Sequence, residues 1–178
     1  MIYPPSEDSY LLAEQVKKYA KNKSVIDIGS GSGIQAETAI ESGAKSVLAT
    51  DINSEAISYL KSKKIHTIKS NLFNKIKSKF DLIVFNPPYL PRDKREDKEI
   101  SIATTGGKKG DEIIINFLKQ AKSHLNKNGI ILLVLSSLTP KNRITALLKK
   151  QKMKYEVLAS QNFFFETLEV WKIQIANK

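Results

Sequence analysis

The sequence contains no cysteine and only two histidines, His66 and His124, among its 178 residues. A chain without cysteine forms neither a disulfide nor a thiolate metal site, and two histidines offer little for zinc, so we expect no bound metal. No stretch approaches the roughly 20 apolar residues of a membrane span. The first residues include neither a basic region nor an apolar run, so they do not look like a signal peptide. We therefore expect a soluble protein of the cytoplasm, without a membrane partner.

Positive charge is what the sequence has in excess. The formal net charge is +11 and the isoelectric point is about 9.7. A surplus of this size favours an anionic partner such as RNA, DNA or a ribonucleoprotein. The lysines are scattered and have no aromatic residues interleaved with them, so lysines that simply fill solvent-facing positions explain the charge equally well.

Short β-branched runs alternate with amphipathic stretches, which is typical of an α/β fold with a mostly parallel sheet. We expect seven strands, over residues 24–28, 46–50, 65–69, 81–85, 130–135, 154–160 and 163–175. The last two are joined so tightly that they predict an antiparallel C-terminal hairpin. Helices on both faces are expected from an N-cap at Ser6, over 34–42, after 53–54, and over 111–126 with Gly129 closing the helix. A last helix is expected to run to residue 150 from Thr139 as N-cap and Pro140 as first helical residue. We find no linker or repeat, so residues 1–178 are expected to form a single domain.

A glycine-rich loop, Asp27-Ile28-Gly29-Ser30-Gly31-Ser32-Gly33, follows the first expected strand. Glycines there let the backbone approach a ligand closely. A dinucleotide fingerprint would place its third glycine at residue 34, which is isoleucine, and no Gly-Lys-Ser/Thr of a phosphate-binding loop follows. Asp27 would attract a cationic amino group rather than a pyrophosphate. The loop therefore indicates S-adenosylmethionine as the cofactor, with Asp27, Gly29, Gly31 and Gly33 among the binding residues.

Two polar residues end the second and third expected strands. The Asp51 carboxylate can accept both ribose hydroxyls of a nucleoside bound at the carboxyl ends of the strands. Nicotinamide enzymes also carry an acid at this place, and loop capping is a further explanation. Asn71 can hydrogen-bond the adenine amino group, although it too can simply cap its loop.

The tetrapeptide Asn86-Pro87-Pro88-Tyr89, after the fourth expected strand, is the most specific feature of the chain. Its two prolines fix φ and remove two backbone donors, which leaves the Asn86 side-chain oxygen and the Pro87 carbonyl as a rigid edge of acceptors. Such an edge suits a substrate –NH₂ group, on which Tyr89 can stack. Holding both N–H bonds aims the nitrogen lone pair at a methyl donor and stabilises the developing charge. We expect Asn86, Pro87 and Tyr89 to be catalytic and residues 86–89 to bind the substrate of an N-methyltransferase; an ordinary Pro-Pro strand terminator is the alternative.

Together these motifs resemble the Rossmann-like class I methyltransferases that modify amino groups. The opening Ile2-Tyr3-Pro4-Pro5-Ser6-Glu7-Asp8-Ser9-Tyr10-Leu11-Leu12 is similar to the first motif of one family among them. That family is the HemK-like protein-(glutamine-N5) methyltransferases of the archaeal and eukaryotic release-factor type. Residues 50–53, 84–89, 106–110 and 166–170 resemble later blocks of the same family, so the resemblance spans nearly the whole chain.

This resemblance implies methylation of the glutamine in the Gly-Gly-Gln motif of the class 1 translation release factor. It also implies a heterodimer with a small zinc-binding activator subunit, docked at the sheet edge of the third strand, where free backbone groups suit β-augmentation. The chain departs from the family at Lys109, where an acid or amide is usual, and at Asn71, where Asp is common. Carried over by position, the cofactor contacts are Ser9, Asp27, Gly29, Asp51, Ile52, Asn71, Leu72 and Asn86.

Three alternatives stay open. A nucleic-acid amino methyltransferase acting on adenine N6 or guanine N2 would use the same tetrapeptide and fits the +11 charge, but residues 90–110 are mixed in charge. A protein lysine methyltransferase is the second, although the acceptor edge suits a neutral –NH₂ better than an ammonium group. A cofactor-binding module without turnover is the third, and the intact Asn86 and glycine loop argue against it.

Overall fold

The computed structural model describes residues 2, 4–88 and 110–176 of the chain. Its helices are α1 (Glu7–Tyr19), α2 (Ile34–Glu41), α3 (Ser54–Ser62), α5 (Glu112–Ala121) and α6 (Lys141–Lys150), with a short 3₁₀ turn, η1 (Lys122–His124). Its strands are β1 (Ser24–Ile28), β2 (Ser46–Asp51), β3 (Thr67–Lys69), β4 (Phe80–Phe85), β5 (Leu125–Ser136), β6 (Met153–Asn162) and β7 (Thr167–Ile175). None of the helices within these ranges is long and apolar enough to cross a membrane.

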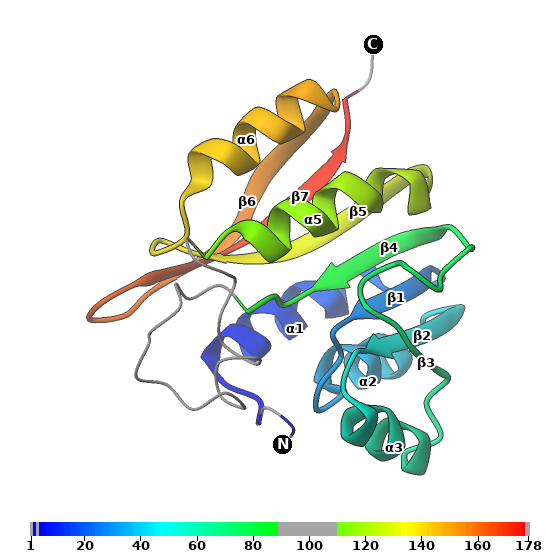
Figure 1. Cartoon of the computed structure of the whole chain (residues 1–178). Coiled ribbons are helices and arrows are strands. Elements are labelled where there is room, and N and C mark those ends of the chain that lie inside the picture. Colours follow the sequence, from blue (N-terminus) through cyan, green and yellow to red (C-terminus); the bar gives the residue numbers. More distant parts are fainter. Residues whose placement is uncertain (1, 3, 89–109, 177–178) are drawn as a thin grey trace.

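All seven strands belong to one sheet, in the order β3-β2-β1-β4-β5-β7-β6 (Figure 1). Strands β1 to β5 pair in parallel, whereas β7 is antiparallel to both β5 and β6. The predicted mostly parallel sheet with an antiparallel C-terminal hairpin is therefore confirmed. The strand order reverses between β1 and β4, and in open α/β sheets ligands bind beyond the carboxyl ends of the strands at such a switch point.

Helices cover both faces of the sheet, as expected, with α1, α2 and α3 on one side and α5 and α6 on the other (Figure 1). Successive side chains of a strand point to opposite faces. In β4, Leu82 and Val84 join the apolar cluster that contains α1, whereas Ile83 and Phe85 join the cluster that contains α5. Burial on both faces explains why residues 82–85 of β4 are a continuous apolar run.

The expected boundaries are wrong between α5 and β5. The sequence predicts a helix to Asn126, closed by Gly129, but α5 ends at Ala121 and β5 begins at Leu125. Gly129 lies inside the strand, where a Cβ atom would come within 3.0 Å of the carbonyl oxygens of Phe80 and Asn126. The pairing of β4 with β5 is irregular at this point, so the glycine allows a close passage of two strands rather than ending a helix.

Two helix starts also differ in detail from the prediction. Ser6 takes the N-cap position of α1, but its hydroxyl donates to the Glu7 carboxylate and caps no helical N–H group. Pro140, not Thr139, is the N-cap of α6. Thr139 instead donates its N–H to the Ser136 carbonyl, which closes a turn and moves the helix start by one residue.

Candidate active site

A cavity of about 990 Å³ lies at the carboxyl edge of the sheet, around the ends of β1, β2, β3 and β4. It brings together most of the residues that the sequence predicts for cofactor and substrate. Gly33 is not among the lining residues, and Tyr89 lies outside the described part of the chain. The predicted residues that line the cavity are Ser9, Asp27, Gly29, Gly31, Asp51, Ile52, Asn71, Leu72, Asn86, Pro87 and Pro88.

The glycine loop is tied to the end of β2. Its backbone is left-handed at Gly29 and Gly31, with φ of +64° and +51°, a conformation that glycine adopts without steric cost. The Ser30 N–H donates to the Thr50 carbonyl at 2.8 Å, and the Gly31 N–H donates to Asp51 Oδ2 at 2.9 Å. The acids that end β1 and β2 are thereby held at the same edge of the cavity.

Gly33 has a different environment from the other two glycines. It has a φ of +86° and precedes α2, and a Cβ atom there would lie 2.5 Å from Leu60 Cδ2. Leu60 belongs to α3 and is fully buried. The structure therefore gives Gly33 a role in packing α2 beside α3, and its contact with the cofactor stays a prediction.

Asp27 is buried at the inner wall of the cavity, and its Oδ2 atom has no hydrogen-bond partner among the described residues. Burial, reinforced by the nearby negative charge of Asp51, raises the pKa of Asp27 from 3.8 to about 7, although a hydrogen bond with Ser30 lowers it. A cationic ligand group beside Oδ2 would satisfy this oxygen and favour the ionised carboxylate. Asp27 therefore fits the amino group of S-adenosylmethionine.

Asp51 is held rigidly by backbone donors. Its Oδ1 accepts the Asn53 N–H at 2.8 Å and its Oδ2 accepts the Gly31 N–H at 2.9 Å. A carboxylate has about four lone-pair sites, so each oxygen can still accept a ligand hydroxyl. The arrangement fits the expected contact with two ribose hydroxyls.

The turn after β3 carries Asn71 and Leu72 on the cavity wall. Leu72 has a φ of +47°, a left-handed conformation that costs a non-glycine residue about 1–2 kcal/mol. The Ser70 hydroxyl holds this turn, because it donates to the Leu72 carbonyl at 2.9 Å and accepts the Lys75 N–H at 3.2 Å. The exposed Asn71 side chain is thus presented at the place expected for the adenine amino group.

The Asn86 amide is oriented by the start of α1. Its Nδ2 lies 3.4 Å from Ser9 Oγ, and Ser9 Oγ lies 3.1 Å from Asp8 Oδ1. A carboxylate only accepts hydrogen bonds, so the Ser9 hydroxyl donates to Asp8 and accepts from Asn86. This polarity leaves Asn86 Oδ1 buried and without a partner in the described structure.

Sequence reasoning missed two residues of this site, Asp8 and Gln35. From the sequence, Asp8 is expected only to interact favourably with the positive end of the helix dipole. In the structure it is buried and accepts the hydrogen bond of the Ser9 hydroxyl, which orients Ser9. Gln35 donates from Nε2 to the Ser9 carbonyl at 2.8 Å, and its buried Oε1 has no hydrogen-bond partner within the described ranges. Only the position of Asp8 beside Ser9 in the opening motif signals its role, and nothing in the sequence singles out Gln35.

Three buried atoms of cavity residues have no hydrogen-bond partner among the described residues, and all three are hydrogen-bond acceptors. They are Asp27 Oδ2, Gln35 Oε1 and Asn86 Oδ1. An unsatisfied buried polar group costs roughly 1–3 kcal/mol, and a ligand that supplies N–H donors would recover this free energy. An ammonium group and an –NH₂ group are such ligands.

The sheet topology and the acid followed by a glycine loop at the end of β1 are those of the class I methyltransferases, which use S-adenosylmethionine as their cofactor. The chain belongs to the methyltransferase small domain family, which it matches over residues 6–165. The expected fold class, the enzyme class and the cofactor are thereby confirmed, and the individual relatives confirm the HemK-like resemblance.

Individual relatives agree with this assignment. Over 183 residues the chain is 36% identical to a Methanocaldococcus jannaschii protein named for protein N5-glutamine methyltransferase activity, covering 97% of this chain and 92% of that one. Over 189 residues it is 29% identical to human methyltransferase HEMK2, covering 96% and 88%. The structure of the E. cuniculi Mtq2–Trm112 complex matches with a TM-score of 0.81 at 24% identity, covering 98% of this chain and 99% of that one.

Proposed function

We propose that this enzyme transfers the methyl group of S-adenosylmethionine to the side-chain nitrogen of the glutamine in the Gly-Gly-Gln motif of the class 1 translation release factor. The observation that carries the proposal is Asn86 Oδ1, a buried acceptor that no other described residue pairs with and whose direction is set by Ser9. The name of the Methanocaldococcus jannaschii relative and that of the Mtq2–Trm112 complex, which methylates the termination factor eRF1, support it. We expect the reaction to occur in the cytoplasm.

The chain's own residues would hold the cofactor at three points. The Asp27 carboxylate would bind the amino group, the Asp51 carboxylate the ribose hydroxyls, and Asn71 the adenine amino group. When bound, S-adenosylmethionine supplies a methyl group on a positively charged sulfur. The hydrogen bonds from the Gly31 and Asn53 N–H groups fix the Asp51 carboxylate and the glycine loop in place before the cofactor binds. This preorganisation lowers the entropic cost of binding.

The substrate nitrogen needs help because its lone pair is delocalised into the amide. Asn86 Oδ1 and the Pro87 carbonyl would accept its two N–H bonds, which aims the lone pair at the methyl donor and stabilises positive charge on nitrogen. Neither proline has an N–H group to compete for these acceptors. The proton leaves after methyl transfer, so no separate base is required. Pro88 and Tyr89 complete the proposed substrate contacts.

The charges around the cavity favour a protein substrate over a nucleic acid. Its described lining contains four acids and a single lysine, Lys69. Several exposed lysines lie instead in the turns that directly precede β1, β2 and β4, at the opposite edge of the sheet: Lys21, Lys23, Lys45, Lys77 and Lys79. A phosphate backbone would find few cations to bind in such a lining, and its acids would repel it.

Mass spectrometry after incubation tests the proposal directly. Release factor is treated with enzyme, activator subunit and labelled S-adenosylmethionine, and the modified residue is located in its peptides. One methyl group on the Gly-Gly-Gln glutamine is expected. An unmodified glutamine would overturn the proposal, with greater transfer to RNA or DNA favouring the nucleobase alternative and methyl-lysine favouring the lysine alternative.

We also propose that the small zinc-binding activator subunit pairs with β3. This strand forms one edge of the sheet, and the name of the Mtq2–Trm112 complex supports such a partner. The His66 carbonyl and the Ser70 N–H bond to β2. Hydrogen bonds alternate along a parallel strand, so the N–H groups of Thr67 and Lys69 face away from β2 and are available for β-augmentation.

Proline substitution at this edge tests the docking site. Thr67→Pro removes an outward N–H group that β2 does not use, so we expect it to weaken co-purification with the activator about tenfold or more. Thr67→Val keeps the backbone donor and removes only the hydroxyl, and should bind normally. Equal binding by both variants would exclude pairing at β3.

A further inference from the structure

The turn between β6 and β7 carries two phenylalanines with very little cover. Phe164 is 92% exposed and Phe165 is 84% exposed, and their rings meet edge to face with centroids 4.7 Å apart. The next most exposed large apolar side chain in the described part of the chain, Tyr10, is 58% exposed. Large apolar groups gathered at one exposed point indicate an interaction surface.

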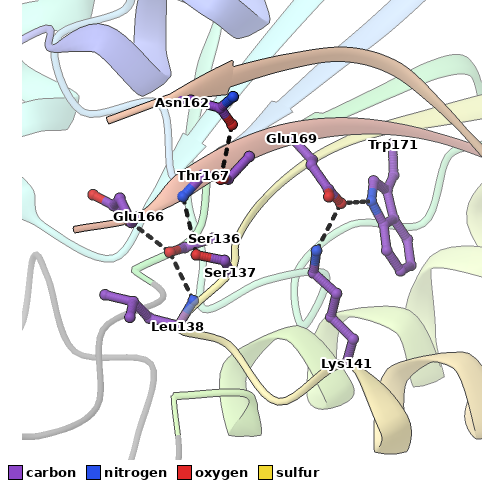
Figure 2. A network of polar contacts seen from close by, with 9 residues as sticks. All are labelled: Ser136, Ser137, Leu138, Lys141, Asn162, Glu166, Thr167, Glu169 and Trp171. Atoms are coloured by element: carbon purple, nitrogen blue, oxygen red, sulfur yellow. Dashed lines mark hydrogen bonds and ion pairs between the residues drawn. The ribbon is translucent and has the colours of Figure 1, made fainter. Parts of the chain in front are cut away.

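This turn is held by polar contacts at its base (Figure 2). Ser136 donates its hydroxyl to the Glu166 carboxylate at 2.5 Å, while Ser137 and Thr167 exchange two hydrogen bonds of 2.8 and 2.9 Å. The Phe163 N–H closes the turn onto the Glu166 carbonyl at 2.7 Å. The two exposed rings therefore stand on a pre-ordered support, and a pre-ordered surface loses less entropy on binding.

The hairpin projects from the edge of the sheet that contains the active site (Figure 1). Strands β4 and β5 are parallel, with Phe85 opposite Leu133, so Asn86 leaves the sheet at the edge toward which β5 continues to Ser136. The antiparallel β7 places Leu168 opposite Ser136, near the end of β5. The preceding turn thus extends past this edge, and β7 lies roughly 10 Å from β4 because adjacent strands are about 4.8 Å apart.

We propose that Phe164 and Phe165 form an aromatic anchor that docks on an apolar patch of the release factor, beside its Gly-Gly-Gln loop. This inference rests on the proposed function. A loop that enters the cavity belongs to a folded protein, whose body extends across the neighbouring hairpin. Uncharged rings with no hydrogen-bonding group match an apolar protein surface and not a phosphate backbone. Pairing of two copies of this chain through the rings would obstruct the edge by which the substrate enters.

Steady-state methylation with two substrates tests the anchor. The substrates are intact release factor and a short Gly-Gly-Gln peptide that reaches only the cavity. For the Phe164→Ser/Phe165→Ser variant we expect KM for intact factor to rise about tenfold or more, as for loss of aromatic anchors elsewhere. Its kcat, its KM for S-adenosylmethionine and its turnover of the peptide should stay at wild-type levels. Ile40→Ser removes a half-exposed apolar side chain at the far end of α2 and should change nothing.

The outcomes separate this inference from the proposed function. A wild-type enzyme that leaves the glutamine of both substrates unmodified would overturn both. A wild-type enzyme that modifies them, with an unchanged KM for intact factor in the double variant, would overturn only the anchor, as would an equal loss of turnover on the peptide. A photo-crosslinking residue at position 164 should capture the release factor, and capture of a second copy of this chain would also overturn the anchor.

Discussion

Ser9 Oγ accepts a hydrogen bond from Asn86 Nδ2 at 3.4 Å, and this contact determines which end of the Asn86 amide faces the cavity. The Ser9 hydroxyl donates its hydrogen bond to the Asp8 carboxylate, and the Gln35 side chain donates one to the Ser9 carbonyl at 2.8 Å. The beginning of α1, far from the tetrapeptide in sequence, therefore acts on the amide as a positioning element. The carbonyl end of Asn86 is left as a fixed acceptor, as required for binding a substrate N–H.

Substitution of Ser9 separates positioning from cofactor binding. Ser9→Ala removes the acceptor that orients Asn86, so we expect kcat to fall about tenfold, because a misplaced catalytic group loses its preorganised geometry. Ser9→Thr keeps the hydroxyl and should retain most activity. The family resemblance assigns Ser9 to the cofactor, and a raised KM for S-adenosylmethionine with unchanged kcat would favour that role instead. Both parameters come from one set of steady-state measurements.

Removal of the Asn86 side chain should affect chemistry far more than cofactor affinity. Asn86→Ala deletes a preorganised acceptor, and losses at comparable groups are about 10²-fold or more in rate. We expect S-adenosylmethionine affinity, measured by calorimetry, to stay within a few-fold. Asn74→Ala, which alters an exposed asparagine outside the cavity lining, serves as the control. A near-normal rate for Asn86→Ala would contradict the proposed role.

Much of this site could be predicted from the sequence, because its chemistry depends on short motifs. The acid before the glycine loop and the amide before two prolines are local signals, and the fold brings Asp27 and Asn86 to one edge as expected. The hydrogen bond from Asn86 to Ser9 joins residues 77 positions apart, and no local pattern encodes it. The prediction that Gly129 ends a helix is wrong for a related reason, since a Cβ atom there would lie 3.0 Å from the carbonyl oxygen of Phe80, which belongs to β4 and is distant in sequence.

Cofactor affinity should depend on pH through Asp27. The pKa of Asp27 is raised to about 7, chiefly by burial, so the free enzyme holds a proton there below neutral pH. A cationic ligand favours the carboxylate form, and binding must then release that proton. We expect S-adenosylmethionine affinity to fall as the pH is lowered from about 7 to 5, approaching tenfold per pH unit. Calorimetry in buffers of different ionisation enthalpy measures the released proton, and Asp27→Asn should bind weakly and without this pH dependence.

The same carboxyl should reduce the stability of the cofactor-free protein at neutral pH. The folded state keeps the Asp27 proton up to a pKa of about 7, whereas the unfolded state loses it near pH 4. Between these values the unfolded state binds fewer protons, so the Asp27 contribution to the free energy of unfolding falls as pH rises. Asp27→Asn should remove this decline and stabilise the cofactor-free protein at pH 8 by on the order of 4 kcal/mol, because the pKa is raised by about three units at about 1.4 kcal/mol each. Urea unfolding at pH 5 and pH 8 checks the prediction; a variant that gains nothing at pH 8 would contradict it.

Gly33 provides a test of whether a motif glycine serves the ligand or the fold. Gly33→Ala combines a left-handed φ of +86° with a Cβ atom 2.5 Å from Leu60 Cδ2. Gly43→Ala shares the left-handed backbone, at +79°, but its Cβ atom would meet nothing closer than 3.9 Å. Both variants should lose about 1–2 kcal/mol from the left-handed backbone conformation, and Gly33→Ala should lose about 1–3 kcal/mol more from overpacking. Chemical denaturation measures this difference. The affinity for S-adenosylmethionine then decides the role, because a packing glycine leaves it unchanged in the folded variant, whereas a cofactor contact would weaken it in Gly33→Ala and not in Gly43→Ala.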